Sequence, residues 1–252
     1  MARKIETIRE IPDISDVEPT PEYNVIWEEV ALSNQKEKAS LHGLSEQEAI
    51  KCYGELSRRP YYLCTVAKMF DVKNVAEVGT ANGLQYFSFA EMLKTTDGHI
   101  WSCDIKDARN KQYIKKYSST TTFCKGDSAV LAADLLKKKV KIDLFYIDGG
   151  HESGDVVKDV YNLSKVQSRN PIWIFDDFDI RFGCYKDIKK IIHNKKDFLI
   201  YRVGNAASGQ PNHQVIVRGK LEISFLYFVW SYIVSWRPNR RIRDFITSLL
   251  RH

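Results

Sequence analysis

Residues 74–83 read Asn-Val-Ala-Glu-Val-Gly-Thr-Ala-Asn-Gly, and this stretch decides the fold. Its first half is a short apolar run with valines, which is typical of a buried strand. Gly79 and Gly83 follow at a spacing that lets the chain turn from the strand into a helix. In a doubly wound α/β fold this first turn lies where ligands bind. Because two glycines at this spacing are also common by chance, a tight turn without a ligand is an equally good interpretation of them alone.

The chain beyond residue 73 alternates between short strands and helices. We expect strands at 74–77, 99–103, 121–124, 142–147, 172–175, 198–203 and 214–218. We expect helices between them at 84–94, 109–116, 129–138, 155–167 and 185–194. This succession predicts an α/β fold with a Rossmann-like, doubly wound, seven-stranded sheet that is mostly parallel. The last two strands are close in sequence, so we expect them to form an antiparallel edge hairpin.

The two ends of the chain differ from this middle part. Residues 1–72 are predicted to be an amino-terminal arm followed by helices, residues 73–219 the α/β domain, and residues 220–252 a helical extension. In the first part we expect a short helix near 23–32 and helical spacing from 45 to 70, with Pro60 separating two helices. The whole chain is thus expected to be one α/β domain with helices added at both ends.

The composition is that of a soluble globular protein. The 252 residues are 44% hydrophobic and 28% charged, which argues against disorder, a fibre and a polytopic membrane protein. The net charge of +6 permits an anionic partner, but the sequence has no nucleic-acid-binding motif and we expect none to bind. Five cysteines without a CxxC pair make a disulfide framework or a zinc cluster unexpected. With no apolar leader at the start, this predicts a cytoplasmic location.

The carboxy-terminal extension is apolar first and basic afterwards. Residues 221–236 are almost wholly apolar and aromatic, and residues 237–252 contain five arginines and one aspartate. Sixteen residues are short for a membrane span, which needs about 20. Two interpretations remain open: a helix in the core or in the interface of a homo-oligomer, and a helix lying on an anionic membrane surface, which would make the protein peripheral at the inner membrane face.

Acidic residues follow the second and third predicted strands. Asp104 comes at the end of the second strand, where a carboxylate can accept both hydroxyls of a ribose, although aspartate is also a common helix cap. Asp127 follows the third strand and could accept an adenine amino group, but alone it is better interpreted as the cap of the next helix. The helix that follows Gly83 presents free backbone N–H groups that suit a carboxylate.

Together these features resemble the class I S-adenosylmethionine-dependent methyltransferases over roughly residues 73–218. The resemblance implies that S-adenosylmethionine is the cofactor. It places the methionine part near Glu77 and the glycine turn, the ribose on Asp104 and the adenine beside Asp127. The implied cofactor residues are Glu77, Gly79, Thr80, Gly83, Asp104, Asp127 and Ser128. By fold analogy, residues 1–72 are a candidate lid over the acceptor.

A second group of carboxylates follows the fourth and fifth strands. Asp148 ends one of these strands, and Asp176 and Asp177 end the other. Because neighbouring parallel strands end at one sheet edge, the three side chains could converge, and converging carboxylates repel unless they are protonated or share a cation. Oxygen ligands favour Mg²⁺, with Mn²⁺ or Ca²⁺ as alternatives. The competing interpretation is structural, with Asp148 capping a helix and the other two making a turn.

This second group looks like that of the metal-dependent O-methyltransferases of the catechol and macrocin types. The resemblance implies a metal on Asp148, Asp176 and Asp177, and a general base three residues after Asp148, which is His151. His151 and, through the metal, Asp148 are then the catalytic residues. The predicted activity is metal-assisted O-methylation of a small acceptor, such as a sugar, a glycan or a glycosylated natural product. The alternatives are a metal-independent methyltransferase and a non-catalytic cofactor-binding or membrane-associated scaffold.

Overall fold

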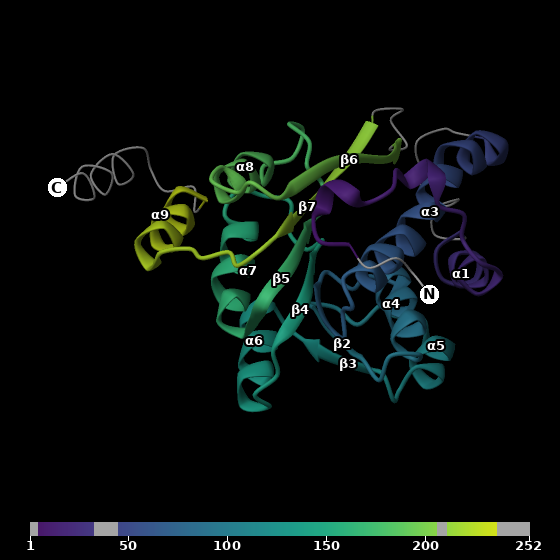
Figure 1. Ribbon diagram of the computed structural model, residues 1–252, viewed down its shortest axis with the longest axis horizontal. Coiled ribbons are helices and arrows are strands. Elements are labelled where there is room, and N and C mark those ends of the chain that lie inside the picture. Colours follow the sequence, from purple (N-terminus) through teal and green to yellow (C-terminus); the bar gives the residue numbers. More distant parts are fainter. Residues whose placement is uncertain (1–4, 33–44, 206–210, 236–252) are drawn as a thin grey trace.

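A central sheet lies between two layers of helices (Figure 1). The computed structural model describes residues 5–32, 45–205 and 211–235. The seven strands are β1 (Asn74–Val78), β2 (His99–Asp104), β3 (Thr121–Lys125), β4 (Ile142–Ile147), β5 (Gln167–Phe175), β6 (Phe198–Asn205) and β7 (Pro211–Arg218). Their order in the sheet is β3-β2-β1-β4-β5-β7-β6. The first five strands run parallel, whereas β7 is antiparallel to both β5 and β6. The predicted fold class, including the antiparallel edge pair, is confirmed.

The two helical layers bury opposite faces of the sheet. On one face lie α3 (Glu46–Met69), α4 (Leu84–Leu93) and α5 (Lys111–Lys116), and on the other α6 (Ser128–Lys137), α7 (Asp155–Leu163) and α8 (Tyr185–Ile192) (Figure 1). Since alternate residues of a strand point to opposite faces, neighbouring aromatic residues of β4 enter different cores. Tyr146 packs in the α3–α4 core and Phe145 in the α6–α8 core, where it stacks on Trp173 with ring centroids 3.9 Å apart.

The expected break at Pro60 is wrong. Helix α3 is continuous through this proline. A proline inside a helix removes one backbone hydrogen bond, but here the following turns are held by tertiary packing. Leu63, Cys64 and Val66 are completely buried, and the Gln85 side chain donates to the Pro60 carbonyl oxygen at 3.4 Å. Packing therefore outweighs the local preference.

The described amino-terminal residues pack against the domain. They form two 3₁₀ turns, η1 (Ile8–Glu10) and η2 (Ile14–Asp16), then α1 (Pro21–Ile26) and a π-helical turn, η3 (Trp27–Leu32). Ile8 and Ile26 are completely buried. The Tyr62 hydroxyl of α3 donates to the Pro12 carbonyl oxygen at 3.0 Å. These residues thus share the core under α3, and the lid role predicted for residues 1–72 stays a prediction.

Strand β5 begins earlier than the sequence predicts. The preceding helix α7 ends at Leu163, and a 3₁₀ turn, η4 (Ser164–Val166), leads directly into the strand. The Gln167 side chain accepts the Trp173 indole N–H at 3.2 Å and the Leu221 N–H at 2.8 Å. Because Leu221 lies 54 residues further along the chain, the helical pattern near residue 167 could not reveal its hydrogen bond.

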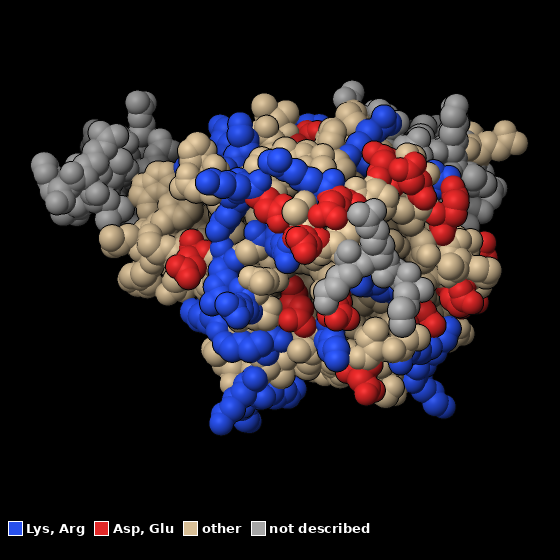
Figure 2. Space-filling model, viewed as in Figure 1, with Lys and Arg blue, Asp and Glu red and all other residues tan. Residues whose placement is uncertain are grey.

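The carboxy-terminal extension begins as the predicted helix, α9 (Phe225–Ser235). It leans on α7 through Phe228, whose ring stacks on that of Tyr161 at 4.3 Å. On its outer side Phe225 and Leu226 are 62% and 66% exposed. Lysines and arginines gather on the part of the surface formed by α6 to α8, beside this helix (Figure 2). Within the described residues no helix is long and apolar enough to cross a membrane. The basic stretch 237–252 lies outside the described residues.

Candidate functional site

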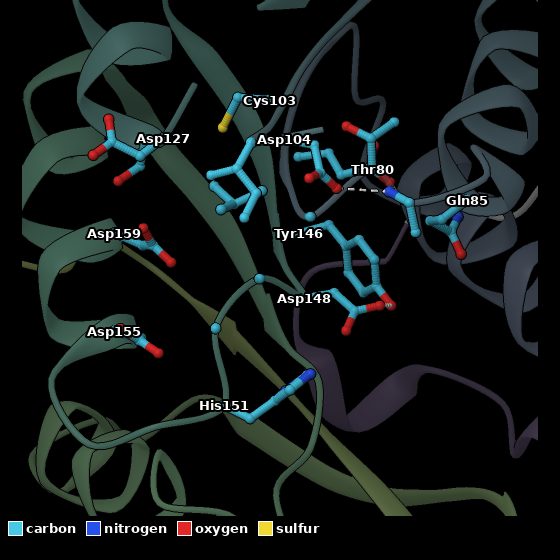
Figure 3. Close-up of a pocket in the computed structure, with 18 of the residues that line it drawn as sticks. Thr80, Gln85, Cys103, Asp104, Asp127, Tyr146, Asp148, His151, Asp155 and Asp159 are labelled. Carbon is cyan, nitrogen blue, oxygen red and sulfur yellow. Dashed lines mark hydrogen bonds between the residues drawn. The ribbon is translucent and has the colours of Figure 1, made fainter. Parts of the chain in front are cut away.

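A cavity of about 590 Å³ opens at the carboxyl ends of β1, β2 and β4. The strand order reverses between β1 and β4, so the cavity lies at the switch point where doubly wound sheets bind ligands. Six of the seven predicted cofactor residues line it, all but Gly83, as do Asp148 and His151. Asp104 lies toward one end of the cavity and His151 toward the other, with Tyr146 and Asp148 between them (Figure 3).

The glycine turn is shaped by a close approach of two loops. Gly79 has a φ of +91°, and a Cβ placed on it would lie 2.0 Å from the Asp148 carbonyl oxygen. Gly83, with a φ of +93°, is the N-cap of α4, and a Cβ there would meet the Phe87 ring at 2.5 Å. Only glycine meets both demands. The turn therefore brings the β1 and β4 loops together at the cavity floor.

A buried acid stands beneath this turn. Glu77 is 1% exposed, and the Ser102 hydroxyl donates to its Oε2 at 2.5 Å. The Thr80 hydroxyl lies 2.5 Å from the Ser102 hydroxyl and extends the chain of hydrogen bonds. Burial raises the pKa of Glu77 to about 8. The side chain is therefore largely protonated at neutral pH in this protein.

Asp104 and Asp127 both line the cavity, but in different roles. Asp104 accepts the Ala81 N–H at 2.9 Å and the Lys106 N–H at 3.0 Å, so it ties the β2 end to the glycine turn rather than capping a helix. Asp127 is the N-cap of α6, as its alternative interpretation predicted. Its Oδ2 also lies 2.7 Å from Lys158 Nζ, and that hydrogen bond lowers its pKa.

Ser128 and Ile105 complete this end of the cavity. Ser128 is completely buried and accepts the Asn162 side-chain amide at 3.1 Å, which fixes α6 on α7. Ile105 was not among the predicted residues. It is 71% exposed at the cavity rim, where an apolar side chain can cover the face of a planar ring. Its position directly after Asp104 is the signal that could have found it.

A cluster of charged groups lies below Asp148. The Tyr146 hydroxyl is 3.0 Å from Asp148 Oδ2 and 3.1 Å from Asp176 Oδ2. Arg59 of α3 places its Nη1 2.6 Å from the same Asp176 oxygen. Both carboxylates belong to strand ends, as the sequence predicts. Arg59 was missed because nothing near it in the sequence links it to residues that far along the chain.

Burial and the guanidinium act in opposite directions on these two acids. Burial, followed by the charge of Asp176, raises the pKa of Asp148 well above its ordinary value. Burial has the largest effect on Asp176 and would raise its pKa as well, but the Arg59 guanidinium and several hydrogen bonds, including one from the Asp177 N–H, together outweigh it and the pKa is lowered. The ion pair between Arg59 and Asp176 is nearly enclosed, with exposed side-chain fractions of 18% and 4%. Removing only one partner of such a pair leaves an uncompensated buried charge, which strongly destabilises the folded state.

Asp177 faces away from this cluster and toward His151. Its Oδ2 lies 2.5 Å from His151 Nδ1, and this hydrogen bond is the main cause that raises the pKa of His151. Asp177 has a φ of +54°, a left-handed conformation that aspartate tolerates better than most residues. His151 is half-exposed and lines the cavity. With Nδ1 held by Asp177, Nε2 is the nitrogen left for a ligand.

The three carboxylates therefore do not form the metal centre that the sequence predicts. Asp176 is paired with Arg59, and Asp177 with His151. Among the residues that the structure describes, no group of three or more histidine, cysteine or acidic side chains is arranged to hold a metal ion. The donor set does not fit a divalent ion in this arrangement, and the predicted magnesium site is not confirmed.

A family model described as "Methyltransferase domain" matches residues 76–178. Residues 76–178 form a methyltransferase domain. The match runs from β1 to the turn after β5 and includes every predicted site residue. The recognition of a class I methyltransferase, and hence of an enzyme, is confirmed. Arg59 lies before the matched segment, so α3 adds a residue to the methyltransferase domain from outside it.

Solved structures agree with this fold at low sequence identity. An O-methyltransferase from Bacillus cereus, solved in complex with SAH, has a TM-score of 0.57 and 13% identity, with 82% of this chain and 95% of that chain covered. A putative O-methyltransferase from Klebsiella pneumoniae has a TM-score of 0.57 and 12% identity, with 83% and 93% covered. The O-methyltransferase TomG from Streptomyces achromogenes, involved in tomaymycin synthesis and solved with SAM, has 0.53 and 13%, with 74% and 88% covered. No curated protein matches the chain.

Proposed function

We propose that this methyltransferase transfers a methyl group from S-adenosylmethionine to a hydroxyl group of a small acceptor, with His151 as the general base. The observation that carries the proposal is one continuous cavity lined by both the glycine turn and His151. The fold neighbours described as O-methyltransferases support the same reaction class. A cofactor on the glycine turn and an acceptor beside His151 would meet within this single space.

The cofactor end of the cavity suits each part of S-adenosylmethionine. The free N–H groups at the start of α4 favour its carboxylate, and Glu77 is an acceptor for its ammonium group once ionised. Asp104 would accept the ribose hydroxyls, because each carboxylate oxygen can take a second hydrogen bond. Ile105 would cover the adenine ring, beside Asp127 and Ser128.

The acceptor end provides a base with a fixed orientation. When bound, S-adenosylmethionine supplies a methyl group on a positively charged sulfur. His151 takes the proton of the acceptor hydroxyl at Nε2, while Asp177 holds Nδ1 and favours the protonated ring that results. The acceptor oxygen would form the new bond to the methyl carbon as the carbon–sulfur bond breaks, and the electron pair would remain on sulfur. Much of the rate then comes from holding oxygen and methyl in line.

The predicted acceptor is a sugar, a glycan or a glycosylated natural product. A small hydroxylated molecule suits a cavity that holds the cofactor as well. The metal-assisted form of the reaction that the sequence predicts, with Asp148, Asp176 and Asp177 as ligands, would need Asp176 to be released from Arg59 and Asp177 from His151. We also propose peripheral contact of α9 with the inner face of a membrane, based on its exposed Phe225 and Leu226.

Calorimetric titration with S-adenosylmethionine and S-adenosylhomocysteine tests the cofactor half of the proposal. We expect binding with and without EDTA, followed by turnover in an acceptor screen that starts from nucleotide sugars and glycans. Absence of binding in both conditions would refute the proposed function. Binding without turnover on any acceptor class would favour the non-catalytic scaffold instead.

A further inference from the structure

Arg59 occupies the place that a bridging metal ion would need. Its Nη1 lies 2.6 Å from Asp176 Oδ2, and the Tyr146 hydroxyl links that same oxygen to Asp148. A divalent ion shared by the two carboxylates would have to bind an oxygen of Asp176 at about 2.0–2.6 Å, and its other oxygen, Oδ1, already accepts the Asp177 N–H at 2.9 Å. The ion and the guanidinium cannot share this position, because both are cations and both need the same lone pairs.

The guanidinium also offsets the repulsion between the Asp148 and Asp176 carboxylates, which was the reason for expecting a metal ion. Two acids that end adjacent strands repel each other in a buried site unless one of them is protonated or a cation compensates them. Arginine keeps its charge at any ordinary pH and presents several N–H donors in one plane. Asp148 and Asp176 both contribute to raising the pKa of Arg59, against the effect of burial. The Arg59 guanidinium, a permanent cation, thus lies where the sequence predicts an exchangeable metal ion.

The position of Arg59 is fixed by the fold. The residues that follow it in α3 are anchored in the core: Tyr62 is 1% exposed and packs on Tyr201 with ring centroids 5.0 Å apart, and Leu63 is completely buried. The Pro60 carbonyl oxygen is bound by Gln85, itself a cavity residue. The arginine therefore does not swing freely between the cavity and the surface.

We propose that Arg59 is the built-in cation of this active site, which makes the methyltransferase independent of divalent metal and excludes metal from Asp148 and Asp176. This proposal rests on the proposed function only in that it takes the cavity to be an active site. Arg59 acts here as a positioning residue that holds Asp176, Tyr146 and Asp148 at the acceptor end. The general base pair of His151 and Asp177 is separate from this cluster.

The test is Mn²⁺ binding to the full-length protein, measured by electron paramagnetic resonance and by calorimetry. We expect no stoichiometric Mn²⁺ site in the wild type and none in Arg59→Lys, which keeps the cation. Arg59→Gln should gain a site that binds Mn²⁺ at least about tenfold more tightly than the wild type. That new site should disappear in the double variant Arg59→Gln/Asp176→Asn.

Two results would overturn the inference. One is a wild-type protein that binds one Mn²⁺ in a manner lost in Asp176→Asn, since metal and Arg59 would then coexist. The other is a folded Arg59→Gln that gains no metal site. If that variant does not fold, the measurement on the wild type still decides. Titration with S-adenosylhomocysteine is run in parallel, because its failure would refute the proposed function without changing the Mn²⁺ result.

Discussion

His151 and Asp177 form a hydrogen-bonded pair, with Nδ1 and Oδ2 2.5 Å apart, although they follow different strands. The pair gives the imidazole one fixed orientation at the edge of the cavity. The same contact raises the pKa of His151. The arrangement is that of a base whose second nitrogen is held by a carboxylate, which is how many enzymes orient a histidine.

Substitution of His151 by alanine should reduce turnover by about 10²–10⁴-fold while leaving the affinity for S-adenosylhomocysteine nearly unchanged. Asp177→Asn keeps the left-handed backbone that asparagine also tolerates. It weakens the hydrogen bond and removes the charge by which Asp177 raises the pKa of His151, so the rise of activity with pH should move to lower pH. Steady-state rates as a function of pH measure both effects. An unchanged rate in His151→Ala would remove this residue from the mechanism.

Asp104→Asn should weaken the binding of S-adenosylmethionine by about 10- to 100-fold, the usual value of a hydrogen bond to a charged group. Asp107→Asn is the matched control, because Asp107 is close by in the sequence, pairs with Arg109 and does not line the cavity. Calorimetry on both variants gives the comparison. Equal affinities in the two variants would contradict a role of Asp104 in holding the ribose.

The contribution of Glu77 to the free energy of unfolding should fall as the pH rises between about 4.5 and 8. Folding raises the pKa of this buried acid to about 8. Within that window the folded state therefore holds a proton that the unfolded state has lost, at a cost of up to about 1.4 kcal/mol per pH unit. Glu77→Gln should flatten this dependence in denaturant unfolding measured across the window. Parallel profiles for the variant and the wild type would refute the assignment.

Gly79→Ala should prevent stable folding or distort the cavity, because its Cβ would lie 2.0 Å from the Asp148 carbonyl oxygen. Gly219→Ala is a matched control. Gly219 has a similar φ of +105° but nothing within 4 Å of the added Cβ, so it should cost only about 1–3 kcal/mol of backbone strain. Thermal unfolding of both variants separates the cost of backbone strain from the cost of the clash with the Asp148 loop. Similar losses in both variants would show that strain alone, rather than the loop contact, acts at Gly79.

The double variant Phe225→Ser/Leu226→Ser should sediment with anionic vesicles to a smaller fraction than the wild type, since these two side chains are exposed apolar residues of α9. Neutral vesicles serve as the control for the electrostatic part. If the wild type stays wholly in the supernatant with anionic vesicles, the membrane interpretation fails. Sedimentation equilibrium of both proteins would then test the alternative, an interface between two copies of the chain.

The order of strands and helices was readable from local pattern, because each element obeys a period of its own. Gly79, Asp104, Asp127 and His151 all line the cavity, while the roles predicted for them stay predictions. These residues stand at fixed offsets from strand ends, and parallel strands gather their carboxyl ends at one edge. The break at Pro60 was wrong for the opposite reason, since only packing around Leu63 and Gln85 keeps α3 continuous.

By itself, the sequence determined a doubly wound sheet, a glycine turn for a cofactor and a set of acids at strand ends. The tertiary structure decided how those acids are paired. Asp176 meets Arg59 from a distant helix, and Asp177 turns to His151 through a left-handed backbone. Charge pairing depends on separations of a few ångströms between side chains far apart in the chain. No spacing along the sequence encodes such distances, whereas strand and helix periods depend only on near neighbours.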